Sequence, residues 1–118
     1  MLDFSQIEQN LISEIKLSSI EAKIFLLITT KGKMNVEKIA KELNLTIDDA
    51  LRISTKLMDL GAFIDISKAE FEAMHPRFTV VNMYRRMCER ENSVFKRNKI
   101  VDNIGVLLER PYDAARTK

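Results

Sequence analysis

The amino-acid sequence predicts a mainly α-helical fold with a helix-turn-helix, a two-stranded hairpin and a long C-terminal helix. The chain of 118 residues contains only 3 Gly and 2 Pro, which leaves little room for loops, and its many Leu, Ile, Lys and Glu residues favour helices. Two amphipathic helical patterns separated by a tight turn fill residues 36–60, and two short alternating patterns fill residues 62–75. Helix, turn, helix and hairpin in this order are typical of a winged helix-turn-helix.

The first two helices are predicted from apolar spacing and from a capping signal. Apolar side chains recur at helical spacing in residues 5–16. Ser18 and Glu21 then have the spacing of a capping box, which begins a second helix that runs to about Thr30. This second segment is apolar nearly all round, so we expect it to be the central core helix, ended by Gly32.

The helix-turn-helix is predicted between Asn35 and Gly61. Asn35 caps a short helix with one apolar stripe, and after a turn Thr46 caps a second, longer helix that ends at Gly61. This second helix is the candidate recognition helix. Its inward face is expected to hold Ile47, Ala50, Leu51, Ser54, Leu57 and Met58. Its outward face is expected to hold Asp48, Asp49, Arg52, Thr55, Lys56 and Asp59.

Two alternating segments predict a hairpin, the wing, with its tip at Lys68-Ala69. Neither Gly nor Asn marks a tight turn at this tip. The first strand places Ile64 and Ile66 on one face, with Asp65 between them.

The last third of the chain is predicted to be one long helix. Pro76 fits its first turn, a helical pattern continues to Arg110, and Pro111 stops it. At 1.5 Å per residue this helix is roughly 50 Å long, which is more than a small body needs. Its apolar residues follow near-heptad steps, so we expect a coiled-coil seam between two copies of the chain. The seam residues are Val80, Tyr84, Met87, Val94, Val101, Ile104 and Leu108.

Three segments follow from this pattern: a winged helix-turn-helix domain at residues 1–75, a dimerisation helix at 76–110 and a flexible tail at 111–118. An alternative is left open, because the polar run of residues 89–93 can break the long helix in two, with Ser93 as a cap. The second half would then fold back onto its own domain.

Composition and charge limit the possible functions. No apolar run approaches the roughly 20 residues that cross a bilayer, and the sequence MLDFSQIEQN does not resemble a signal peptide, so we expect a cytoplasmic protein with no membrane partner. Cys88 is the only cysteine and His75 the only histidine, so we expect no metal site. Without a nucleophile–base pair or a glycine-rich phosphate loop, we expect no cofactor and no enzymatic activity.

The net charge of +2 is unevenly distributed. Residues 1–75 hold nine Lys or Arg and twelve Asp or Glu, a balance of −3, whereas residues 76–118 hold ten and five, a balance of +5. For a protein that binds nucleic acid through its helix-turn-helix, this is an unusual distribution.

Residues 15–110 resemble the small archaeal TrmB-type winged-helix regulators. The resemblance lies in the segments IEAKIFLLI, IAKELNL, LMDLGAF and HPRF, which are signs of fold rather than of catalysis. It implies a homodimeric transcription factor that binds double-stranded DNA. The chain departs from the family where Asp48 and Asp49 begin the recognition helix and where Asp65, Glu70 and Glu72 make the wing acidic.

The candidate DNA contacts come from the recognition helix, the helix before it and the wing. Arg52 can match the acceptors of guanine, and the other candidates can contact phosphates or base edges. The full set is Thr46, Arg52, Thr55, Lys56, Lys38, Lys41 and Lys68. One opposing interpretation is that these residues form an ordinary solvated face. Another is a winged-helix module that binds protein instead of DNA, which the −3 charge of residues 1–75 favours. A small-molecule sensor is a third possibility, and any effector is left open.

Overall fold

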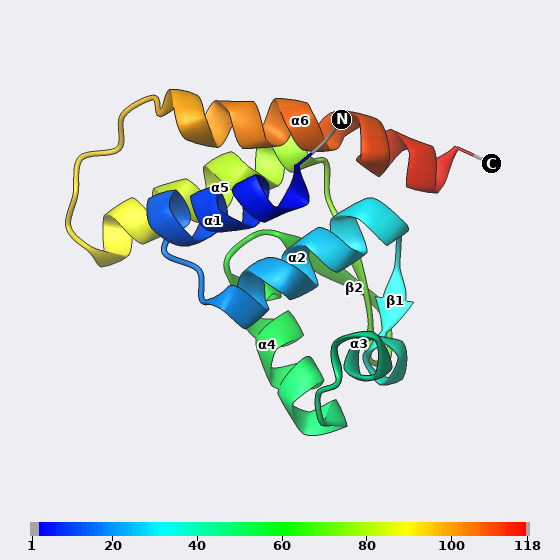
Figure 1. Ribbon diagram of the computed structural model, residues 1–118. Helices are drawn as coiled ribbons and strands as arrows, with labels where there is room; N and C mark the ends of the chain where they lie inside the picture. The colour runs from blue at the N-terminus through cyan, green and yellow to red at the C-terminus, as the bar shows by residue number, and fades with distance from the viewer. Residues whose placement is uncertain (1–2, 118) are drawn as a thin grey trace.

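The computed structural model describes residues 3–117 and contains, across this range, six helices and three short strands (Figure 1). Met1, Leu2 and Lys118, at the ends of the predicted first domain and tail, lie outside the described residues. The elements in order are α1 (Phe4–Ile15), α2 (Ser19–Lys31), β1 (Met34–Asn35), α3 (Val36–Leu43), α4 (Ile47–Asp59), β2 (Phe63–Ser67), β3 (Glu70–Ala73), α5 (Pro76–Arg90) and α6 (Lys99–Arg116). This mainly helical architecture is compatible with a winged helix-turn-helix.

Helix α2 lies at the centre of the molecule, as predicted. Figure 1 shows α1, α5 and α6 gathered at one end, α3 and α4 at the opposite end, and α2 between them. The capping box is confirmed, because Ser18 Oγ accepts the Glu21 N–H at 3.2 Å and the Glu21 carboxylate accepts the Ser18 N–H at 2.9 Å. Ile24, Phe25 and Ile28 on this helix have no exposed surface.

The sheet has three antiparallel strands in the order β1-β3-β2, whereas the sequence predicted a two-stranded wing. The additional strand β1 has only two residues, too few for any alternating pattern to be seen. The Phe63 ring lies between the rings of Phe25 and Phe71, with centroids 6.3 and 6.4 Å away. This face of the sheet joins the core, so Ile64 and Ile66 point outward and are 44% and 42% exposed.

The hairpin tip lies at Lys68-Ala69, as predicted, without the usual turn residues. Ala69 adopts a left-handed conformation with φ of 61°, which costs a residue with a Cβ roughly 1–2 kcal/mol. Its carbonyl accepts the N–H of Val36 at 2.9 Å. The tip is therefore held against the first turn of α3.

The prediction of one long C-terminal helix is wrong. Helix α5 ends at Arg90, residues 91–98 form a loop, and α6 runs back along α5 (Figure 1). Asn92 takes a left-handed conformation just after the end of α5, and the Asn98 side chain, not Ser93, caps α6 by accepting the N–H groups of Ile100 and Val101. The folded-back arrangement buries apolar residues that a single projecting helix would leave in water.

Close contact between α5 and α6 depends on Gly105. A Cβ at this position would lie 2.8 Å from the Cα of Arg77, closer than real carbon atoms pack. Glycine therefore lets the two helix backbones approach where they cross.

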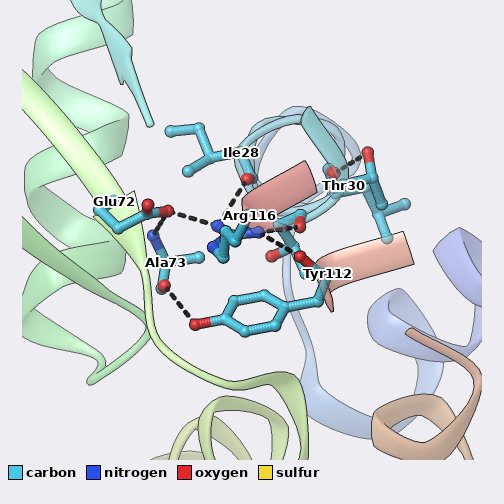
Figure 2. A network of polar contacts seen from close by, with 8 residues as sticks. Ile28, Thr30, Glu72, Ala73, Tyr112 and Arg116 are labelled. Atoms are coloured by element: carbon cyan, nitrogen blue, oxygen red, sulfur yellow. Dashed lines mark hydrogen bonds and ion pairs between the residues drawn. The ribbon is translucent and has the colours of Figure 1, made fainter. Parts of the chain in front are cut away.

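The predicted flexible tail is also wrong for residues 111–116, because Pro111 lies inside α6 and the helix continues to Arg116. The Arg116 guanidinium donates to the carbonyl oxygens of Thr29 at 3.0 Å and Ile28 at 3.3 Å, and it pairs with the Glu72 carboxylate (Figure 2). It also lies 3.7 Å from the centre of the Tyr112 ring. These contacts attach the last turn of α6 to α2 and β3.

In the described part of the chain, no helix combines the length and the apolar character that crossing a membrane requires.

Candidate nucleic-acid interface

Helix α4, the candidate recognition helix, leaves one face uncovered. Its buried stripe consists of Ala50, Ile53, Ser54 and Leu57, and α6 lies at the other end of the molecule (Figure 1). Of the predicted α4 contact residues, Thr46, Arg52 and Lys56 are exposed and Thr55 is partly exposed. A surface on which a nucleic acid can dock is therefore open.

The predicted inward face of α4 is wrong at two positions. Ile47 and Leu51 are 52% and 41% exposed, whereas Ile53, which the prediction omitted, is 4% exposed. The buried stripe follows i, i+3, i+4 and i+7 from Ala50, and this rotation of the helix turns Ile47 and Leu51 toward solvent. Apolar residues therefore share the exposed face with the polar candidates.

Both cations of α4 are paired with acids. Arg52 lies 3.4 Å from Asp49 on the open surface. Lys56 Nζ lies 2.5 Å from the carboxylate of Glu21, whose side chain is 8% exposed at the start of α2. Lys56 is thus directed toward α2, and a phosphate would have to compete with Glu21 for it.

The Glu21 pKa is set by opposing effects. Burial alone would raise it. The hydrogen bonds from Lys56 and from the Ser18 N–H, together with the positive charge of Lys56, outweigh burial and lower the pKa below its ordinary 4.5. The carboxylate therefore stays charged in the folded protein and holds α2 to α4.

We expect Glu21→Gln to remove a specific acid sensitivity. Because the pKa is lowered by folding, the unfolded chain takes up the proton first as the pH falls. This contribution to stability is complete above pH 4.5 and is lost as the pH falls through the folded-state pKa. Glutamine keeps the capping spacing but has no charge to titrate. Urea unfolding from about pH 6 to about pH 3 should show a shallower decline for this variant than for wild type.

The matched control for this experiment is Glu37→Gln, which removes an exposed carboxylate from the first turn of α3. It measures how much of the change in slope follows from removing any one carboxylate. Equal slopes for the Glu21→Gln variant and wild type would show that the Glu21–Lys56 pair does not contribute.

The remaining candidate cations gather around the first turn of α3. Lys38 and Lys41 are exposed on α3 and line a surface groove of about 530 Å³ with Asn35, Glu37 and Glu42. Lys68 is exposed at the hairpin tip, next to Ala69, whose carbonyl accepts the Val36 N–H at the start of α3. Within residues 3–117 none of these three lysines forms an ion pair. The fold thus places the hairpin tip, which carries Lys68, beside the start of the helix that carries Lys38 and Lys41.

The predicted dimerisation residues do not form an exposed seam. Val80, Val101, Ile104 and Leu108 are at most 1% exposed and form part of the protomer's own core, and Met87 is 7% exposed. Tyr84 packs against Phe95 with ring centroids 5.9 Å apart, and Val94 lies in the loop and is 74% exposed. The heptad-like spacing arises from the packing of α5 on α6 within one chain. A homodimer of this structure would need other residues at its interface.

His75 and Cys88, the only histidine and the only cysteine of the chain, both pack within the fold. His75 caps α5, where its Nδ1 accepts the Arg77 N–H at 3.2 Å, and its Nε2 lies 3.4 Å from Glu109. Cys88 is buried.

Neither protein-family models nor curated proteins nor solved structures give a match to this chain. The function proposed below therefore depends on the residues and contacts described above.

Proposed function

We propose that this protein is a winged-helix transcriptional regulator of the TrmB-like kind that binds double-stranded DNA. The observation that carries the proposal is the uncovered outer face of α4, which would be the second helix of the proposed helix-turn-helix. In such proteins the second helix enters the major groove and its N-terminal residues meet the base edges. Thr46, Asp48, Arg52 and Thr55 all lie on this face.

Phosphate contacts supply most of the affinity of such complexes. In this protein we assign them to Lys38 and Lys41 on α3 and to Lys68 at the hairpin tip, since these lysines are exposed and lie near one another. Arg52 is held by Asp49 on the open surface, in an exposed pair that is worth little. It can therefore exchange this carboxylate for a guanine edge.

Anisotropy of labelled genomic duplex fragments, measured from about 50 to about 200 mM salt, tests the proposal. We expect the affinity to fall with salt, and the double variant Lys38→Glu with Lys41→Glu to lower the slope of log K against log salt by about 2. Arg52→Glu should weaken binding to a specific fragment about ten- to hundredfold. These residues are exposed, so the variants should unfold thermally as wild type does.

The matched control for charge is Lys96→Glu with Lys99→Glu. It changes the net charge by the same amount, but the two exposed residues lie in and after the loop between α5 and α6, away from α4 (Figure 1). It should retain the salt slope of wild type. Failure of wild type to bind any duplex more tightly than about 10⁻⁴ M at the lowest salt, the weak limit of non-specific association, would contradict the proposal.

A protein-binding winged-helix module is the second candidate. Two observations favour it. Lys56 forms an ion pair with Glu21, and the exposed Ile47 and Leu51 give the outer face of α4 an apolar surface. This candidate predicts that no duplex affinity will be found and that the variants of Lys38, Lys41 and Arg52 will behave alike in the anisotropy experiment.

A further inference from the structure

Two aliphatic side chains stand on the face of α4 that we assign to DNA. Ile47 and Leu51 are 52% and 41% exposed, and at about 100° per residue they lie about 40° apart on the helix, side by side. Asp48 follows Ile47 and Arg52 follows Leu51, and both of these polar residues are exposed as well. A surface helix normally keeps such aliphatic side chains in its buried stripe, so their exposure at this place needs an explanation.

The first two turns of α4 hold these side chains in a defined position. Thr46 Oγ1 accepts the Asp49 N–H at 3.1 Å, and the Thr46 carbonyl accepts the Ala50 N–H at 3.0 Å. Ala50 and Ile53, on the opposite side of the same turns, are buried in the core. The helix start is therefore fixed, and its exposed residues are those that reach base edges in a helix-turn-helix.

The major groove offers one distinctive apolar feature, the 5-methyl group of thymine. The neighbouring Asp48 carboxylate can only accept hydrogen bonds, so it suits the amino group of cytosine or adenine and opposes the two acceptors of guanine. An aliphatic pair beside an acceptor thus matches thymine next to cytosine or adenine. This combination also explains how an acidic helix start is compatible with base recognition.

We propose that Ile47 and Leu51 contact thymine methyl groups and make the protein selective for thymine beneath the start of α4. This inference rests on the function proposed above and adds the base chemistry of the site. The face itself carries the acids Asp48 and Asp49, and we commit to DNA as its occupant because cations that are unpaired among the described residues lie beside it. The exposed Lys38, Lys41 and Lys68 lie on and beside α3, which packs directly against α4, and they form no ion pair within residues 3–117.

The test compares a duplex fragment that wild type binds in the salt series with the same fragment carrying deoxyuridine at every thymidine position. This exchange removes the methyl groups and keeps base pairing and charge. We expect binding to weaken about fourfold for each methyl group contacted, which follows from the transfer of one methyl group out of water. The double variant Ile47→Ala with Leu51→Ala should bind the thymine duplex more weakly and should lose most of the difference between the two duplexes.

The matched control is Ile64→Ala, which shortens an equally exposed aliphatic residue, 44% exposed, on the outer face of β2. It should discriminate between the duplexes as wild type does. A preference caused by altered duplex shape would persist in the double variant Ile47→Ala with Leu51→Ala, and that result would overturn the inference.

Two further outcomes separate this inference from the proposed function. Equal binding of both duplexes by wild type would overturn the proposed selectivity for thymine. It would leave the proposed DNA binding intact. Absence of binding to either duplex would overturn both, and it would indicate that the aliphatic face of α4 serves a protein partner.

Discussion

The variant Leu108→Ala is expected to lower the free energy of unfolding by about 2–5 kcal/mol, as truncations of fully buried leucines do. Leu108 has no exposed surface and belongs to the main core. Removing its side chain takes apolar contacts from the core and leaves a cavity that the packed helices can only partly close. Urea unfolding followed by circular dichroism at one pH measures the loss.

The neighbouring residue provides the matched control. Leu107 is 39% exposed, so Leu107→Ala should cost much less, within about 0.5–1 kcal/mol. The single long helix predicted from the sequence would place both leucines outside the domain core, so equal small losses would contradict the folded-back arrangement of α5 and α6.

The second large effect concerns Arg116. Replacing it by Met keeps the aliphatic stem but removes the donors to the Ile28 and Thr29 carbonyls and the partner of Glu72. These acceptors lie partly out of water, with the Glu72 side chain 22% exposed, so we expect a loss of about 1–3 kcal/mol. Urea unfolding measures it.

Arg110→Met is the control, because Arg110 is an exposed arginine on the same helix. It should leave stability within about 0.5 kcal/mol of wild type. In a double-variant cycle, Glu72→Gln with Arg116→Met should lose less than the sum of the single losses, because the two side chains interact directly. Additive losses would show that the last turn of α6 is not held by this contact. An Arg116→Met variant as stable as the Arg110→Met variant would show the same.

The first half of the fold was largely predictable because its signals are local. The Ser18–Glu21 capping box, the Asn35 and Thr46 caps and the positive-φ glycines Gly32 and Gly61 each act within one helical turn, and all are found in the structure. Hydrogen bonds between residues three or four positions apart leave a readable spacing in the sequence.

The C-terminal half was not predictable in the same way. The apolar spacing of Val80, Val101 and Leu108 suits a seam between two chains and a seam between two helices of one chain equally well. The loop of residues 91–98 decides between them, and its ends are set by Asn92 and Asn98 rather than by the predicted Ser93. Helix α6 extends past Pro111 because Arg116 finds partners on α2 and β3, which are remote in sequence.

In the candidate site, Arg52 and Lys56 of the recognition helix were predicted to face outward, and both are exposed. The exposure of Ile47 and Leu51 and the pairing of Lys56 with Glu21 were not predicted. Both depend on how α4 is rotated against its neighbours. An apolar pattern with several possible stripes cannot specify that rotation.

The amino-acid sequence by itself determined where helices α1 to α4 begin and end and that a hairpin follows them, because caps, glycine stops and apolar periods act over a few residues. Only the tertiary structure decided which apolar residues are covered, which lysines gather beside α3 and where the last helix lies. Whether a side chain meets water or protein depends on segments that are distant along the chain and are brought together only when the core closes.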